Sequence, residues 1–124
     1  MTTKYTKDHE WVRIDGDIAT IGITSHAANS LGELVYVELP EVGDEFSKSD
    51  AIVVVESSKS ASDVYAPISG EITEVNEILN DEPNKVNDFP LSDGWIVKIK
   101  FSEIKEIDDL MSEDEYNDYI KEES

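Results

Sequence analysis

Lys59 lies near the tip of a predicted β-hairpin, where its amine would be accessible to another enzyme. The apolar, β-branched residues 53–55 lead into this segment, residues 63–66 lead out of it, and a short serine-rich stretch separates the two. Two β-prone runs around a short polar segment are typical of a hairpin. An amine displayed on a tight turn is suited to covalent modification. We therefore expect Lys59 to carry a prosthetic group and the protein to be a carrier.

Three roles are open to the amine of Lys59. An ordinary surface lysine needs no special surroundings. A catalytic lysine needs burial or a neighbouring cation to favour its neutral form, whereas the nearby charges here are Glu56 and Asp63. An acceptor for acylation needs exposure and small neighbours that admit the modifying enzyme. Small residues flank the lysine on both sides: Ser57, Ser58, Ser60 and Ala61.

Other reactive side chains are few. The chain has no cysteine, which excludes disulfides, thiolate ligands and a cysteine nucleophile. His9 and His26 are its two histidines, and metal sites usually need three or four ligands, so no metal site is expected. The serines around Lys59 have no histidine close in sequence, and no glycine-rich phosphate loop is present. An independent enzyme is the class that the sequence favours least.

The size and charge of the chain restrict its partners. Its 124 residues predict a single domain, with a core over about 5–101 and an acidic, helical segment over about 102–124. The formal net charge of −19 would repel nucleic acid and anionic membranes. The acidic surface either steers the protein toward basic faces of partners or only keeps it soluble. Without an apolar run of about 18 residues or an apolar leader, the cytoplasm is the expected location.

Alternating apolar residues predict a mainly β fold. Two of the alternating segments flank Asp15-Gly16, a pair that favours a tight hairpin turn. The predicted strands outside the Lys59 hairpin are residues 11–14, 18–23, 34–39, 71–75 and 95–101. Trp11 and Trp95 are expected in the core or at its edge.

The predicted helices are short. Thr24 is suited to cap a helix over residues 25–31, which Gly32 would end. A helical turn is expected over 76–79, followed by a loop over 80–93. The tail is expected to form two short helices that pack on the β core through apolar side chains. These side chains are Ile104, Ile107, Met111, Tyr116, Tyr119 and Ile120.

Motifs spread over about 90 residues resemble the glycine cleavage system H protein family. They include His9-Glu10-Trp11-Val12 near the start, Glu56-Ser57-Ser58-Lys59 in the hairpin and Gly94-Trp95 near the end. The remaining matches, in order, are residues 4–6, 22–24, 31–33, 37–43, 66–71, 75–77, 83 and 86–87. The resemblance implies a hybrid barrel-sandwich of two small antiparallel sheets.

The resemblance also implies the chemistry of the hairpin. Lys59 falls on the lysine that carries lipoate as an amide in this family. Glu56, three positions before it, and Gly70, eleven after it, match residues that help the lipoate ligase or lipoyl transferase recognise the hairpin. Ser58 and Ser60 depart from the family, which usually has Val and Ala there.

The implied partners act in sequence on the lipoyl arm. Glycine decarboxylase would pass the aminomethyl group of glycine to the arm, aminomethyltransferase would remove it, and dihydrolipoamide dehydrogenase would reoxidise the dithiol. The chain itself would be a non-catalytic carrier, and a monomer is expected. Two alternatives remain open: a lipoate relay that donates lipoyl groups to 2-oxoacid dehydrogenase subunits, and an unmodified acidic interaction module. A biotin carrier is disfavoured because such domains usually have methionines beside the lysine.

Overall fold

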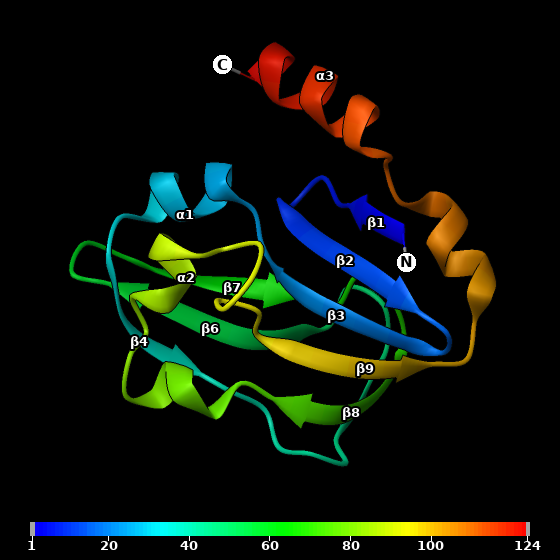
Figure 1. Cartoon of the computed structure of the whole chain (residues 1–124), viewed down its shortest axis with the longest axis horizontal. Helices are drawn as coiled ribbons and strands as arrows, with labels where there is room; N and C mark the ends of the chain where they lie inside the picture. Colours follow the sequence, from blue (N-terminus) through cyan, green and yellow to red (C-terminus); the bar gives the residue numbers. More distant parts are fainter. Residues whose placement is uncertain (1, 124) are drawn as a thin grey trace.

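The computed structural model describes residues 2–123, which form two antiparallel β-sheets that face each other across one apolar core (Figure 1). The larger sheet has six strands in the order β1-β2-β3-β9-β8-β5, and the smaller has three in the order β4-β6-β7. This architecture confirms the mainly β, two-sheet fold expected from the sequence. The two sheets differ in size, however, and β1 and the very short β5 form the two edges of the larger one.

The strands follow the alternating segments closely. Those of the larger sheet are β1 (Thr2–Tyr5), β2 (Glu10–Asp15), β3 (Ile18–Ile23), β5 (Glu45–Phe46), β8 (Gly70–Val75) and β9 (Val97–Phe101). Those of the smaller sheet are β4 (Leu34–Glu38), β6 (Ala51–Ser57) and β7 (Ala61–Tyr65). The helices are α1 (Ser25–Leu31), η1 (Glu77–Asn80), α2 (Lys85–Asp88), η2 (Ile104–Asp109) and α3 (Glu113–Glu123), where η denotes a 3₁₀-helix.

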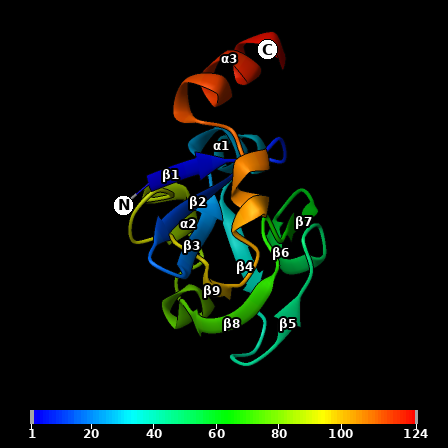
Figure 2. The same cartoon turned by 90° about the vertical axis from the view of Figure 1, so that its right-hand side faces the viewer.

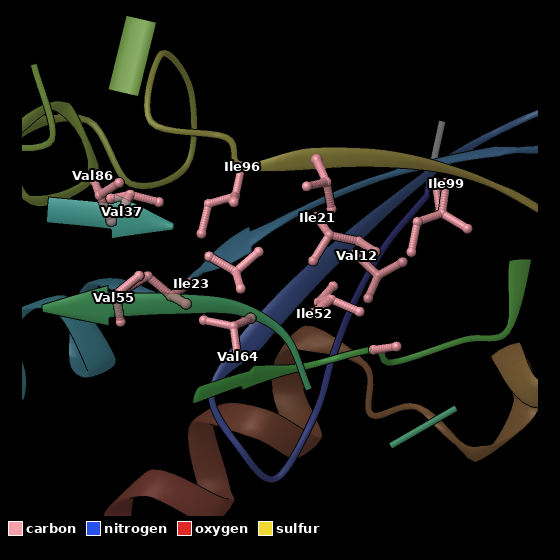
Figure 3. Close-up of a cluster of buried hydrophobic side chains, with 14 of the residues drawn as sticks. Val12, Ile21, Ile23, Val37, Ile52, Val55, Val64, Val86, Ile96 and Ile99 are labelled. Carbon is pink, nitrogen blue, oxygen red and sulfur yellow. The ribbon is translucent and has the colours of Figure 1, made fainter. Parts of the chain in front are cut away.

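The core lies between the inner faces of the two sheets (Figure 3). Because successive side chains of a strand point to opposite faces, every second residue of these strands can reach the core. Val12, Ile21 and Ile99 come from the larger sheet; Val37, Val55 and Val64 come from the smaller one. These aliphatic side chains are almost completely buried, so the sheets that carry the hairpins are held as one unit.

Helix α1 forms as its flanking residues predict. The Thr24 hydroxyl accepts a hydrogen bond from the Ala27 amide at 3.4 Å, which satisfies one of the free amides at the start of a helix. Gly32 follows the last turn with φ of 84°, a left-handed conformation that costs glycine little. The prediction of a helix over 25–31 is confirmed.

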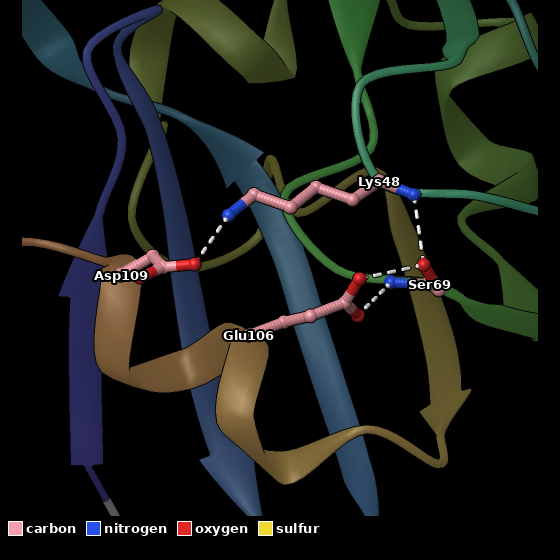
Figure 4. A network of polar contacts seen from close by, with 4 residues as sticks. All are labelled: Lys48, Ser69, Glu106 and Asp109. Atoms are coloured by element: carbon pink, nitrogen blue, oxygen red, sulfur yellow. Dashed lines mark hydrogen bonds and ion pairs between the residues drawn. The ribbon is translucent and has the colours of Figure 1, made fainter.

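The helix η2 is tied to the loop before β8 by polar contacts (Figure 4). The Glu106 carboxylate accepts hydrogen bonds from the Ser69 amide at 2.7 Å and from the Ser69 hydroxyl at 2.8 Å. The Lys48 amide donates to Ser69 Oγ at 2.8 Å, and Lys48 Nζ lies 3.1 Å from an Asp109 oxygen. These contacts fix the path of the chain from β9 toward α3.

The tail forms the two helices expected, the first of them a 3₁₀-helix. The prediction that Ile104 packs on the β core was wrong, since this residue is 71% exposed. Figure 2 shows α3 lying beyond β1 and α1, outside the two sheets. Tyr116 of α3 is buried in a second apolar cluster with Tyr5 of β1 and Trp11 of β2. Trp11 is fully buried and Trp95 is half-buried beside it, as expected for core and core-edge aromatics.

One prediction of irregular structure was wrong. Residues 80–93 were expected to be loop, but residues 85–88 form the short helix α2, whose Val86 is buried in the core. Pro83 and Pro90 flank this helix and led to the prediction of a loop. A helix of four residues is also too short to show helical periodicity. Among the helices described here, none is long and apolar enough to cross a membrane.

Candidate functional site

The turn between β6 and β7 is ordered by Ser57. The Ser57 amide donates to the Ser60 carbonyl at 2.8 Å, and Glu56 pairs with Ala61 one step below. The Ser57 hydroxyl oxygen accepts hydrogen bonds from the amides of Lys59 and Ser60, both at 3.2 Å. A short serine side chain can bond its neighbouring backbone in this way and so stabilise a tight turn. The predicted hairpin is confirmed, and its turn has one defined backbone path.

Lys59 lies in the turn between β6 and β7, and this turn is at the left edge of the molecule in Figure 1. Its side chain is exposed, and so are those of Ser58 and Ser60 on either side. Within residues 2–123 the structure gives the Lys59 amine no hydrogen bond or ion pair. The amine is therefore presented outward on an ordered backbone, with small neighbours, as a substrate for modification requires.

The two residues that the resemblance linked to ligase recognition lie in different places. Glu56 is half-buried in β6, the central strand of the smaller sheet, and pairs with Tyr36 of β4 and Ala61 of β7 beside the turn. Gly70 opens β8 in the other sheet, beyond the end of β7 that is remote from the turn. A side chain at Gly70 would collide with the Lys100 carbonyl and with Ile99 Cγ2. Close strand packing thus accounts for this glycine, and its role in recognition stays a prediction.

A pocket of about 470 Å³ opens beside the hairpin. It is lined on one side by β7, including Asp63 and Tyr65, and on the other by α1 and the segment before β2. Ser62, three residues after Lys59, is the lining residue closest to the lysine in sequence. We call this cavity the hairpin pocket.

Glu10 is the unexpected residue of the hairpin pocket. Its side chain is 2% exposed, yet it lines the pocket wall. One carboxylate oxygen accepts a hydrogen bond from the Thr6 hydroxyl at 2.9 Å, and the other accepts one from the Tyr65 amide at 2.9 Å. Burial raises the pKa of Glu10 to about 7, against the opposing effect of these two hydrogen bonds. A carboxyl group that changes charge near neutral pH therefore faces the pocket.

The two histidines meet at the same pocket. The rings of His9 and His26 lie 4.5 Å apart between centroids, and both line the pocket together with Tyr119 of α3. His9 Nδ1 also lies 2.8 Å from the Tyr116 hydroxyl. Among the described residues, no group of three or more histidine or carboxylate side chains is arranged to hold a metal ion.

The sequence predicted the position of Lys59 but indicated no functional role for Glu10, His9 or Tyr116. The available signal for Glu10 was slight: a carboxylate at the first position of a strand that continues Trp11-Val12, where an apolar residue is usual. The long-range bonds from Tyr65 and Tyr116 could not be read from spacing, because they join positions 55 and 107 residues apart.

Known proteins resemble this chain along nearly its whole length. The family model "Glycine cleavage H-protein" matches residues 3–123. The glycine cleavage system H protein of Halothermothrix orenii is 52% identical over 118 residues, which cover 95% of this chain and 92% of the relative. The H protein of Thermotoga maritima is 49% identical over 120 residues and 97% of each chain.

A solved structure agrees with these sequences. The crystal structure of a glycine cleavage system H protein from Mycobacterium marinum superposes with a TM-score of 0.82 at 38% identity, covering 94% of each chain. The family match extends from β1 to α3, so it includes both the hairpin and the hairpin pocket. This chain belongs to the glycine cleavage H-protein family.

Proposed function

We propose that the protein is the lipoyl carrier of a glycine cleavage system, with lipoate attached to Lys59 through an amide bond. The observation that carries this proposal is the exposed amine at the tip of an ordered hairpin, in a chain that matches the H-protein family from residue 3 to residue 123. When attached, the lipoyl group supplies a disulfide that takes up the aminomethyl group derived from glycine.

The hairpin supplies what a modifying enzyme needs. Ser57 fixes the backbone on both sides of Lys59, so a lipoate ligase or lipoyl transferase meets one conformation of the turn. The small side chains of Ser58 and Ser60 leave the amine accessible from several directions. The backbone of Glu56 is paired next to the turn, and its carboxylate is available for recognition. The departures at Ser58 and Ser60 alter exposed positions and leave this scaffold intact.

The hairpin pocket is suited to hold the aminomethyl group of the loaded arm while the protein moves from one partner enzyme to the next. An aminomethyl group carries an amine, which is cationic when protonated, and the pocket presents the carboxyl groups of Glu10 and Asp63. Glu10 is buried and held by Thr6 and Tyr65, so it is oriented before any ligand arrives. A carboxylate in such a low-dielectric wall attracts an amine more strongly than it would in water. The pocket would also keep water from the loaded arm.

The scaffold contributes tethering. Attachment to one folded domain raises the effective concentration of the arm at each active site that the domain docks on. We infer that the docking enzymes are glycine decarboxylase, aminomethyltransferase and dihydrolipoamide dehydrogenase, and that the chain performs no catalytic step itself. The family's name supports a role within the glycine cleavage system.

Replacing the acceptor lysine tests the proposal. The purified protein would be incubated with lipoate, ATP and a lipoate ligase, and its intact mass measured, with peptide mapping of the modified site. We expect one lipoyl-sized mass increase at Lys59 in the wild type and none in Lys59→Arg, which keeps the charge but has no acylatable amine.

The exposed Lys105 of η2, changed to Arg, is the matched control and should be modified like the wild type. Wild-type protein that gains no lipoyl mass, or Lys59→Arg protein that still supports glycine–bicarbonate exchange with the partner enzymes, would overturn the proposal.

A further inference from the structure

Tyr116 links the C-terminal helix α3 to the rest of the molecule. Its ring is 4% exposed and stacks on Tyr5 of β1, with centroids 4.8 Å apart and an angle of 10° between the ring planes. Tyr116 does not line the hairpin pocket, but Tyr119, one turn later on the same helix, does. A buried aromatic stack of this kind fixes the position of α3 relative to β1.

The Tyr116 hydroxyl makes two short hydrogen bonds in this buried position. It lies 2.8 Å from Nδ1 of His9 and 2.7 Å from Oγ1 of Thr24. Thr24 is 4% exposed and caps α1, another element of the pocket wall. Tyr116 thus joins three segments that are far apart in sequence: the approach to β2, the start of α1, and α3.

His9 is held in an unusual backbone conformation. Its φ is 68°, in the left-handed region that a residue other than glycine adopts at some cost. Its carbonyl accepts the Thr24 amide at 2.9 Å, and its ring packs edge-on against Tyr116 with centroids 5.7 Å apart. The next residue is Glu10. Strain of this kind persists only where surrounding contacts over-determine the conformation.

From these contacts we propose that Tyr116 is a positioning residue for the hairpin pocket: through its hydroxyl, the C-terminal helix fixes the imidazole of His9 as part of the pocket wall. The His9 ring stands between α3 and His26 of α1, where a rotation about its side-chain bonds would change the shape of the pocket wall. The helix α3 therefore acts on the cargo site without contacting Lys59.

The bond from Tyr116 helps to select one orientation of the His9 ring, because it engages Nδ1. A hydrogen bond at Nδ1 distinguishes the two nitrogens of an imidazole. Replacing the hydroxyl by hydrogen leaves the stack on Tyr5 in place but removes the two hydrogen bonds that the Tyr116 hydroxyl makes with His9 Nδ1 and Thr24 Oγ1. The wall should then sample several ring orientations.

The first readout is the His9 side chain itself, observed by nitrogen-15 NMR in the unmodified protein. We expect Tyr116→Phe to shift the His9 Nδ1 resonance and broaden the ring signals, while the backbone spectrum of both sheets stays close to wild type. Tyr5→Phe is the matched control, because it removes a hydroxyl from the same stack and leaves the Tyr116 bonds intact. His9 ring signals that are equal in Tyr116→Phe and Tyr5→Phe would overturn the proposal.

The second readout rests on the proposed function. Loss of the cargo to water consumes one water molecule and yields formaldehyde, ammonia and the free thiol, so formaldehyde release from the loaded protein measures protection. We expect Tyr116→Phe to release it about fivefold faster than wild type, the effect of losing the hydrogen bond that holds His9, and Tyr5→Phe to match wild type. Equal release rates for both variants and the wild type would refute the role of Tyr116 in protection. A wild-type chain that cannot be lipoylated refutes the carrier function instead, and leaves the NMR result to decide the His9 link.

Discussion

Glu10 is a residue whose position opposes stability. Its carboxyl group is buried beside Thr6 and Tyr65, and burial raises its pKa to about 7. Ionising it inside the protein costs more than ionising it in the unfolded chain, where its pKa is close to 4.5. Above neutral pH, the negative charge of Glu10 therefore lowers the stability of the folded protein relative to the unfolded chain. The proposed binding of an amine in the hairpin pocket gives a physical reason for this arrangement.

This cost has a defined pH window. Below about pH 4.5 Glu10 is protonated in both states, and the folded protein has its full stability. As pH rises from about 4.5 to about 7, the unfolded chain loses the proton first, so stability falls. Glu10→Gln cannot ionise at this position. We expect the free energy of unfolding of Glu10→Gln, measured relative to wild type, to increase by about 3 kcal/mol as pH rises from 4.5 to 8.

Urea denaturation at several pH values measures this difference. The exposed Glu71 of β8, changed to Gln, serves as the control and should follow the wild-type pH profile. A constant difference between Glu10→Gln and wild type from pH 4.5 to pH 8 would contradict the raised pKa of Glu10.

Residues with local surroundings were predictable and residues with distant partners were not. Lys59 could be identified because the strands and small side chains that display it are its sequence neighbours. The roles of Glu10 and Tyr116 depend on bonds to Tyr65 and His9, which only the folded arrangement of β2, β7 and α3 creates. No spacing rule connects such positions.

At the scale of elements, Asn87 explains why a four-residue helix is retained. Its side-chain oxygen accepts the Leu34 amide at 2.8 Å, and its side-chain nitrogen donates to the Gly32 carbonyl at 2.7 Å and to the Ala28 carbonyl at 3.4 Å. Helix α2 thereby connects the end of α1 to the start of β4 through hydrogen bonds. Since α1 forms one wall of the hairpin pocket, these bonds help to hold that wall in place.

Truncating this side chain should weaken the junction measurably. We expect Asn87→Ala to lower the free energy of unfolding by about 2–3 kcal/mol, because it leaves backbone groups of α1 and β4 without partners. Urea denaturation gives the value. Asn84→Ala, which removes only an exposed contact to Asp88, should change stability by less than about 0.5 kcal/mol. An equal decrease in the free energy of unfolding in the two variants would show that the Asn87 hydrogen bonds do not stabilise the junction.

The elements bounded by characteristic turn or cap residues were predicted from the sequence. The elements that depend only on pairing with distant segments were not. Asp15-Gly16 and the Thr24 cap mark their hairpin and helix locally, and both were confirmed. Strand β1 exists because Thr2–Tyr5 pairs with β2, and β5 because two residues pair with the start of β8. Helix α2 depends on the partners of Asn87. These three elements have no periodicity of their own long enough to detect.

The whole molecule presents its hairpin within a strongly acidic surface. Asp63 is exposed and Glu56 half-buried on the hairpin strands, and the exposed Glu33 directly precedes Leu34, which pairs with Ser57. With a net charge of −19, the field of the entire chain adds to these local carboxylates. A partner that receives the arm must approach this surface, and a basic rim around its active-site entrance would be attracted to it over about one Debye length.

Ionic strength should therefore control docking but leave the chemistry unchanged. The Debye length falls from about 10 Å at 0.1 M salt to about 3 Å at 1 M, so long-range attraction is screened across this range. We expect the apparent KM of glycine decarboxylase for the lipoylated chain to rise on the order of tenfold, while kcat stays nearly constant. Free lipoamide, an uncharged acceptor, is the control and should show no such rise. A KM for the chain that is flat across the salt range would mean that the acidic surface keeps the protein soluble and does not guide it to this partner.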